Sequence, residues 1–74
     1  MSISRSQSRA ARGKLGWSQG ELAAAAGVHK RTVADWERGE RECFTKTIGQ
    51  MQRAFADAGI QFVSGSIDGV QWHP

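Results

Sequence analysis

Two helix-like stretches separated only by Ala-Gly-Val limit what this chain can fold into. They lie on either side of Gly27 in the segment WSQGELAAAAGVHKRTVADWERG, residues 17–39. Glycine adopts the positive φ angles that end a helix, so Gly27 can turn the chain within about three residues. The small alanines before Gly27 let two helices approach closely. The pattern therefore predicts two short helices packed across each other and joined by a tight turn.

Apolar spacing and helix-ending glycines predict four helices in all. They run from Ser4 to Leu15, from Ser18 to the break at Gly27, from His29 or Lys30 to Arg38, and from near Thr45 to Ala58. Ser18 and Glu21 match a capping box, in which each residue bonds the backbone N–H of the other. Thr45 is a suitable N-cap for the fourth helix.

Helical spacing also predicts which side chains face inward. These are Leu22, Ala25 and Ala26 in the second helix, Val33 and Trp36 in the third, and Ile48, Met51, Phe55 and Ala58 in the fourth. Trp17 and Trp36 can in principle stack on bases, but their spacing favours the core or an interface.

The C-terminal residues change period from helical to alternating. Ile60 and Phe62, and then Val70 and Trp72, alternate with polar residues around a turn-like SGSIDG. This predicts two short strands. The expected fold class is mainly α, a bundle of four helices with a helix-turn-helix and a short C-terminal β-strand pair. Residues 1–59 would form the helical domain and residues 60–74 a strand tail.

The composition argues against several kinds of protein. The chain of 74 residues has one cysteine, Cys43, and two widely spaced histidines. It therefore lacks an intrachain disulfide or a metal-ligand set, and no catalytic constellation or cofactor is expected. Cys43 is either a redox switch or incidental. A domain this small usually needs disulfides, a metal or a partner subunit for stability. The partner subunit is the remaining route, so we expect an oligomer.

The longest apolar run, LAAAAGV, is too short to span a membrane. No targeting segment is expected, and the expected location is the cytoplasm.

Positive charge is concentrated in the part of the chain that holds the two helices. Residues 1–41 carry eight of the ten Lys and Arg residues, and the net charge is +3. Such a distribution favours an anionic partner, nucleic acid first and a membrane surface second. Charge alone is equally compatible with a solvated surface.

One face of the third helix stays free when Val33 and Trp36 face inward. On it stand Lys30, Arg31, Ala34, Asp35 and Arg38. A helix of this width fits the major groove of B-DNA, and the small Ala34 permits close approach. The alternative is a polar outer face of a small helical bundle, but the cations and the thin position together favour DNA.

The segment LGWSQGELAAAAGVHKRTVADWERGER closely resembles the Cro/C1-type (XRE) helix-turn-helix family. The matching residues are Gln19, Glu21, Leu22, Ala23, Gly27, Val28, Thr32, Val33, Trp36, Glu37, Arg38 and Gly39. RAARGKLGW is similar to the first helix of the family, and GIQFVSG with GVQW is similar to the strand-forming tail of its small single-domain members. The resemblance implies a lambda-repressor-like bundle.

The resemblance also implies roles for individual residues. Base edges would be met by Lys30, Arg31, Ala34 and Asp35, and phosphates by Gln19, Thr32, Arg38 and Arg41. Gln19 can alternatively brace the third helix, and Asp35 can accept from cytosine N4 or orient Arg31 or Arg38. Arg12 and Glu37 would form an internal ion pair.

The function implied is a sequence-specific regulator of transcription, usually a repressor, that binds double-stranded DNA. It would act as a homodimer on a two-fold symmetric operator, with recognition helices about 34 Å apart. The tail would make the dimer through Ile60, Phe62, Val63, Val70 and Trp72. Alternatively, the hairpin folds back on its own helices, and the dimer forms elsewhere or only on DNA.

The second hypothesis is an antitoxin or adaptor whose main role is to bind a protein partner. A regulatory protein partner is also compatible with the first hypothesis, and no membrane partner is expected.

Overall fold

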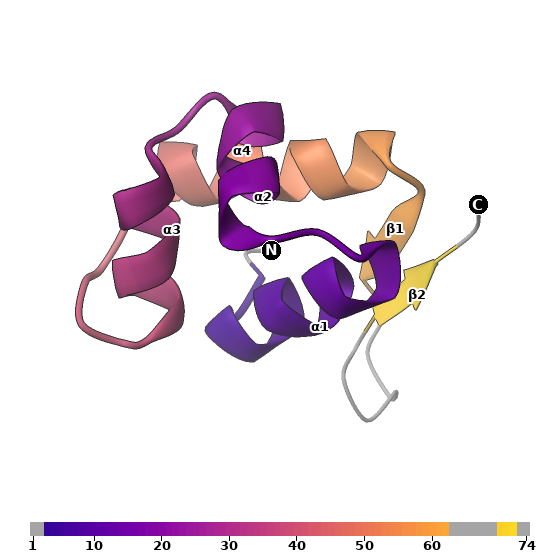
Figure 1. The fold of residues 1–74 in the computed structure, drawn as a ribbon, viewed down its shortest axis with the longest axis horizontal. Coiled ribbons are helices and arrows are strands. Elements are labelled where there is room, and N and C mark those ends of the chain that lie inside the picture. Colours follow the sequence, from indigo (N-terminus) through magenta and orange to yellow (C-terminus); the bar gives the residue numbers. More distant parts are fainter. Residues whose placement is uncertain (1–2, 63–69, 73–74) are drawn as a thin grey trace.

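Four helices followed by a pair of short strands make up this protein in a computed structural model that describes residues 3–62 and 70–72. Figure 1 shows α1 running below α4, with α2 in front of α4, α3 at one end of the molecule and the strands at the other. The mainly helical fold class predicted from the sequence is confirmed. The elements are α1 (Arg5–Leu15), α2 (Gln19–Ala26), α3 (Lys30–Glu37), α4 (Thr45–Asp57), β1 (Ile60–Phe62) and β2 (Val70–Trp72).

Capping boxes start the first two helices. The backbone N–H of Glu21 donates to Ser18 Oγ at 3.0 Å, and Glu21 Oε1 accepts from the Ser18 N–H at 2.9 Å. Ser4 and Gln7 make the same reciprocal pair at the start of α1. Each box satisfies two backbone donors that a helix N-terminus otherwise leaves unpaired.

Glycines in the left-handed region end α2 and follow α3. Gly27 has φ 72°, and the next N–H, that of Val28, donates to the Ala23 carbonyl at 3.0 Å. Gly39 has φ 82° and directs the Glu40 N–H to the Asp35 carbonyl at 2.9 Å. A side chain at either position would be strained. The predicted tight turn between α2 and α3 is therefore present.

The starts of α3 and α4 have no side-chain caps. His29 precedes α3 without a capping hydrogen bond, as expected for a poor capping residue. The prediction that Thr45 caps α4 is wrong, because Thr45 is already the first helical residue and Phe44 occupies the cap position. Phe44 is 85% exposed, and its apolar side chain cannot accept a hydrogen bond.

One hydrophobic core joins all four helices. Leu22, Val33, Met51 and Phe55 are completely buried, and Trp36 is 2% exposed. Ile48 is partly buried against this core. These residues lie at the predicted positions of α2, α3 and α4.

The prediction for Ala25 is wrong. Ala25 is exposed, and Ala23 is buried beside Leu22 and Ala26. The four-alanine run offers no contrast in size or polarity, so spacing alone could not identify its inner face.

The strands lie against the helices of their own chain. They pair antiparallel, with Ile60 opposite Trp72 and Phe62 opposite Val70. Ile60 is 4% exposed, the Phe62 ring packs edge-on against Phe55 at 5.8 Å, and β2 contacts α1. Val63 and the turn-like residues 64–69 lie outside the described residues, as do the side chains of residues 70–72. The fold-back that formed the alternative arrangement is therefore present for β1.

Candidate nucleic-acid interface

The inner face of α3 is fixed to the rest of the molecule. Val33 is fully buried, Trp36 is 2% exposed and Glu37 is 3% exposed. The helix lies across α2, with which it makes extensive contact (Figure 1). Because the inner face is closely packed, the rotation of α3 about its axis is set, and so is the set of residues that it presents to solvent.

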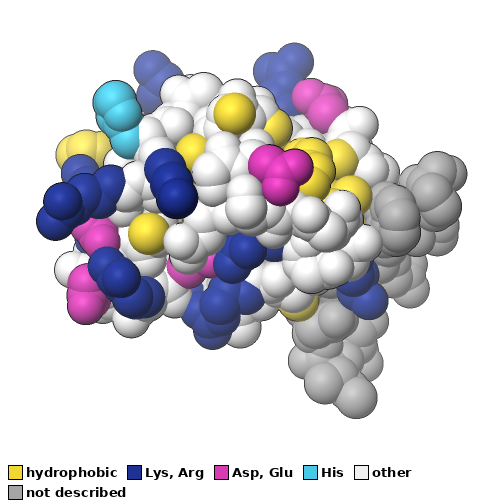
Figure 2. All heavy atoms as spheres, viewed as in Figure 1, with side chains coloured by type: hydrophobic (Ala, Val, Ile, Leu, Met, Phe, Trp, Pro, Cys, Tyr) yellow, Lys and Arg dark blue, Asp and Glu magenta, His cyan; other side chains and the backbone are white. Residues whose placement is uncertain are grey.

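The outer face of α3 brings together the residues that the sequence singled out. Lys30, Arg31 and Arg38 are exposed, and Ala34 and Asp35 are half-buried between them. Figure 2 shows Lys and Arg side chains gathered over this end of the molecule, with acidic side chains among them. The small Ala34 leaves a low point between longer side chains, as a helix needs when its backbone must approach base edges.

Acidic residues tie the arginines of this face together. Arg38 Nη2 donates to Asp35 Oδ1 at 2.7 Å and lies 3.1 Å from Glu40 Oε2. Arg31 Nε lies 3.6 Å from Asp35 Oδ2, which is an ion pair without a close hydrogen bond. Positively and negatively charged side chains therefore alternate along the outer face.

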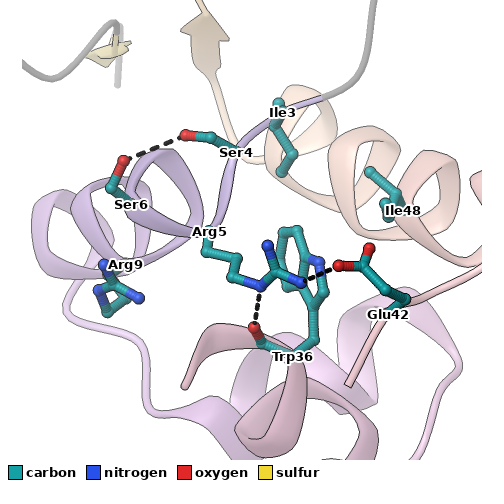
Figure 3. A pocket seen from close by; sticks show the side chains of 8 residues that line it. All are labelled: Ile3, Ser4, Arg5, Ser6, Arg9, Trp36, Glu42 and Ile48. Carbon is teal, nitrogen blue, oxygen red and sulfur yellow. Dashed lines mark hydrogen bonds and ion pairs between the residues drawn. The ribbon is translucent and has the colours of Figure 1, made fainter. Parts of the chain in front are cut away.

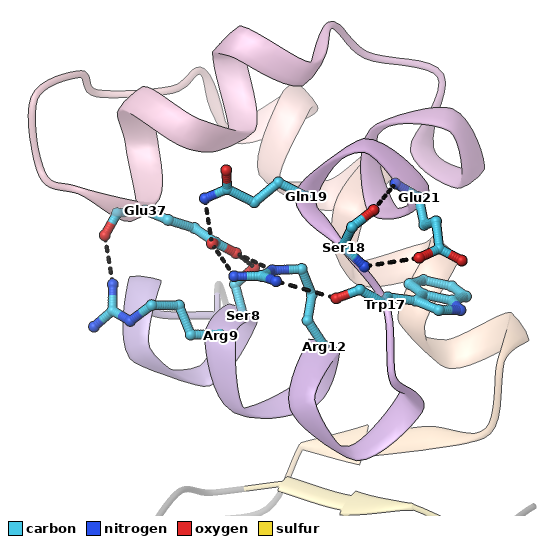
Figure 4. A network of polar contacts seen from close by, with 8 residues as sticks. All are labelled: Ser8, Arg9, Arg12, Trp17, Ser18, Gln19, Glu21 and Glu37. Carbon is cyan, nitrogen blue, oxygen red and sulfur yellow. Dashed lines mark hydrogen bonds and ion pairs between the residues drawn. The ribbon is translucent and has the colours of Figure 1, made fainter.

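A carboxylate buried beneath α3 joins three helices (Figure 4). Glu37 Oε1 accepts from Arg12 Nη2 at 2.7 Å, and Oε2 accepts from Arg12 Nε at 3.0 Å. Ser8 Oγ donates to Oε2 at 2.6 Å, and Gln19 Nε2 donates to Oε1 at 3.1 Å. The structure thus contains the Arg12–Glu37 ion pair that the family resemblance implied, and the pair is bidentate.

Burial and hydrogen bonding act in opposite directions on Glu37. Its side chain is 1% exposed, and this loss of water raises the pKa. Hydrogen bonds from Arg12, Ser8 and Gln19, with the positive charge of Arg12, more than offset burial and leave the pKa below its ordinary 4.5. Glu37 is therefore ionised at neutral pH.

Arg12 and a second arginine of α1, Arg9, also bond the ends of the neighbouring helices. Arg12 Nη1 donates to the Trp17 carbonyl at 3.1 Å, just before α2, and Arg9 Nη1 donates to the Glu37 carbonyl (Figure 4). Helix α1 therefore fixes the start of α2 and the end of α3 relative to each other.

The predicted phosphate-binding residues lie around the recognition face. Gln19 is half-buried and braces Glu37, as the second of its two predicted roles requires. Thr32 is half-buried, and Arg38 and Arg41 are exposed.

Arg5 is a residue that the sequence analysis missed. Its Nε donates to the Trp36 carbonyl at 2.6 Å, and its Nη2 bonds Glu42 Oε1 at 2.7 Å and the Arg41 carbonyl at 3.3 Å. These contacts lie in a pocket of about 440 Å³ between the start of α1 and the α3–α4 loop (Figure 3). Arg5 thereby fixes the loop that carries Arg41, but nothing in its sequence neighbourhood marks a contact so distant along the chain.

The tryptophans of the helical domain are structural. Trp36 is 2% exposed, so its ring is not available to stack on bases. Trp17 stacks on Phe55 with ring centroids 5.8 Å apart. Both positions agree with the core role that their spacing favoured.

The surroundings of Cys43 favour the thiol over the thiolate. Burial raises its pKa above the ordinary value, and the positive charges of Arg41 and Arg5 only partly oppose this. The thiol form therefore dominates at neutral pH, and thiols react more slowly than thiolates.

The described residues contain neither a cluster of metal-ligand side chains nor a helix that could cross a membrane. No three His, Cys, Asp or Glu side chains there are grouped as metal ligands. No helix in residues 3–62 has the length and apolar character needed to cross a membrane.

Comparison with known proteins identifies the arrangement. Residues 9–43 match the family model described as helix-turn-helix, and this range spans most of α1, all of α2 and α3, and the loop that follows. A search of the curated proteins found no match for the chain. With the tight turn at Gly27 and the packed α3, this match supports a helix-turn-helix protein of the Cro/C1 (XRE) type that binds DNA as a transcription regulator.

Proposed function

We propose that this protein is a sequence-specific repressor that binds a two-fold symmetric operator in double-stranded DNA as a homodimer. The observation that carries the proposal is the contrast between the two faces of α3. Its inner face is packed on α2 and bonded through Glu37 to α1, while its outer face presents Lys30 and Arg31 to solvent. A rigidly mounted helix with exposed cations suits the major groove.

Base contacts are proposed for the central outer face and phosphate contacts for its surroundings. Lys30 and Arg31 suit guanine O6 and N7, and Ala34 lets the helix approach. Lys30 also packs its stem near Gly20, since a Cβ at Gly20 would meet Lys30 Cδ at 3.6 Å. Asp35 lies on the same face, where it can meet a base edge or orient Arg31 or Arg38. Phosphate contacts are proposed for Thr32, Arg38 and Arg41. A further one is proposed for Gln19, through the side-chain N–H that it does not donate to Glu37.

A homodimer formed by the tail is proposed, but with strand-edge pairing in place of a contact through Ile60. The side chain of Ile60 is used by the core of its own chain, so it is not available to a second subunit. The sheet has two strands, and within the described residues neither of them pairs with a further strand on its outer edge. Strand edges readily pair with another chain. Edge pairing, with apolar contacts from Phe62, Val63, Val70 and Trp72, is therefore the proposed interface.

The position of the tail sets the geometry of such a dimer. The chain extends 27 Å along its longest axis, with α3 at one end and the hairpin at the other (Figure 1). Two chains joined in line at their hairpins would separate their α3 helices by more than the roughly 34 Å between successive major grooves. The two long axes must therefore be inclined to each other.

The test of DNA specificity is selection from a randomised duplex library with the full chain. A two-fold symmetric consensus with half-sites about 10 base pairs apart is expected. Footprinting on the DNA upstream of the gene then shows whether the protein regulates its own expression. Recovery of unrelated sequences only would contradict sequence-specific binding.

The test of the tail is sedimentation of the full chain and of a chain ending after Phe62. The shorter chain keeps Ile60 and Phe62 for the core and lacks β2. We expect the full chain to be a dimer without DNA and the shorter chain, still helical by circular dichroism, to be a monomer. A folded, dimeric shorter chain would place the interface elsewhere.

An antitoxin or adaptor that binds a protein partner is the second candidate. It is favoured by Phe44, an aromatic side chain that is 85% exposed in the α3–α4 loop. Salt dependence separates the two functions. Binding to phosphates weakens steeply with salt, whereas binding to an apolar surface around Phe44 would change little.

A further inference from the structure

Asp35 lies between two arginines on the outer face of α3. Its Oδ1 accepts from Arg38 Nη2 at 2.7 Å, and its Oδ2 lies 3.6 Å from Arg31 Nε. The Asp35 side chain is 18% exposed, whereas those of Arg31 and Arg38 are 89% and 60% exposed. The carboxylate is therefore mostly covered and pairs with two cations that extend into solvent.

We propose that Asp35 is a positioning residue that sets DNA specificity through Arg31, without contacting a base itself. The inference rests on the proposed function and refines the role of one residue in it. The Asp35 side chain is short and mostly covered, whereas Arg31 and Arg38 extend past it into solvent, so the arginines reach a base edge before the carboxylate does.

The contact with Arg31 leaves the recognition end of its guanidinium free. Asp35 faces Nε, so the two terminal nitrogens remain as a fork for guanine O6 and N7. A long arginine side chain loses rotamer freedom when it binds. Holding its stem in place before binding reduces that cost and favours one direction of approach.

The same contacts limit attraction to DNA in general. Arg38 Nη2 also lies 3.1 Å from Glu40 Oε2. The two arginines and two acids of this edge are together neutral, so the edge adds little to phosphate attraction in the free protein. Sequence-independent binding depends on such attraction. Asp35 therefore favours the cognate site by orienting Arg31, while its charge lowers the affinity for DNA of every sequence.

The test compares affinity for two duplexes of equal length at one salt concentration. One carries the consensus that the full wild-type chain selects from a randomised library, and the other has a random sequence. The variants are Asp35→Asn, Arg31→Ala, the double variant and Glu40→Gln. Glu40→Gln is the matched control, because it removes the same charge from the same edge but from a residue that pairs with Arg38 and follows the helix.

Asp35→Asn and Glu40→Gln are both expected to bind the random duplex a few-fold more tightly, because each adds one net positive charge. Only Asp35→Asn is expected to reduce the ratio of consensus to random affinity, by about tenfold. This reduction is a part of the discrimination that one bidentate base contact provides. In the Arg31→Ala background, Asp35→Asn should leave this ratio unchanged. A lower folded fraction reduces both affinities by the same factor, so the ratio reports specificity and not stability.

Two results would overturn the inference. A wild-type ratio in Asp35→Asn would show that the carboxylate does not act on specificity. An equal loss with and without Arg31 would show that Asp35 contacts a base directly. If the wild-type chain selects no consensus, the proposed function fails first, so the two failures are distinguishable.

Discussion

Helix α3 carries two acidic residues that arginines hold, one on each face. Glu37 on the inner face is 1% exposed and receives four side-chain hydrogen bonds, from Arg12, Ser8 and Gln19. Asp35 on the outer face is 18% exposed and is held by arginines that are mostly in solvent. The chemistry of the two clusters is nearly the same, but their surroundings differ.

This difference gives the inner cluster a structural role and leaves the outer cluster able to exchange its partners. In the dry inner cluster, a missing partner would leave a charge without water to replace it, so the geometry is fixed. In the outer cluster water can replace any partner, so each pair is weak and can exchange for a phosphate or a base. One helix can therefore be held rigidly on one side and remain free to bind on the other.

The largest expected effect comes from breaking the inner cluster. Glu37→Gln keeps the shape of the side chain but leaves the charge of Arg12 without its counter-ion. Removal of one partner of a buried pair costs about 3–5 kcal/mol. Arg12 is 18% exposed and can recover some water, so the lower end of that range is expected. Urea unfolding followed by circular dichroism measures the change.

The control for this prediction is Glu42→Gln. Glu42 also pairs with an arginine, Arg5, at 2.7 Å, but its side chain is 89% exposed. The expected loss is below about 1 kcal/mol. Similar losses for both variants would contradict the distinction between buried and exposed clusters.

A dependence on pH follows from the lowered pKa of Glu37. The folded state holds the carboxylate ionised, so the protein gains stability from it above the ordinary pKa of 4.5. That gain should disappear as the pH falls through the lower pKa of the folded state. The difference in unfolding free energy between wild type and Glu37→Gln is therefore expected to shrink with acidification below pH 4.5. A constant difference would show that ionisation of Glu37 does not stabilise the fold.

Local features of the fold could be predicted from the sequence because their causes are local. A capping box needs residues three apart, such as Ser18 and Glu21, and a helix stop needs one glycine, such as Gly27. The Arg12–Glu37 pair became predictable only through the family resemblance. The face of the alanine run was not predictable, since Ala23 and Ala25 are identical side chains and only tertiary contacts distinguish them.

Contacts distant in sequence account for what the sequence analysis missed. Ser8 is completely buried against Glu37, 29 residues further on, and Arg5 bonds Glu42, 37 residues further on. Ser8 lies one turn before Arg12 on α1, and this spacing could have indicated a shared partner. No comparable signal marks Arg5. The pairing of Asp35 with both Arg31 and Arg38 was open in the sequence, because each geometry depends on side-chain rotamers.

On the outer face, Arg31→Ala tests base recognition. A bidentate contact with guanine is worth about 1–3 kcal/mol, so affinity for the selected consensus should fall by that amount and specificity should relax at one position. Fluorescence anisotropy with the consensus and with a random duplex measures both effects. An equal loss on the two duplexes would make Arg31 a phosphate contact.

The smallest expected effect sharpens the comparison most directly, because Asp35→Asn is the same change from carboxylate to amide as Glu37→Gln. Asp35 pairs with Arg38 three residues on and with Arg31 four residues back on one helix, and exposed pairs at these spacings contribute about 0.3–0.5 kcal/mol each. The unfolding free energy should therefore fall by less than about 1 kcal/mol. Added salt should remove most of this difference, since screening weakens exposed charges and leaves buried ones largely unaffected. Urea unfolding of both variants at low and high salt makes the comparison. A large, salt-independent loss in Asp35→Asn would mean that the outer cluster holds α3 in place as the inner one does.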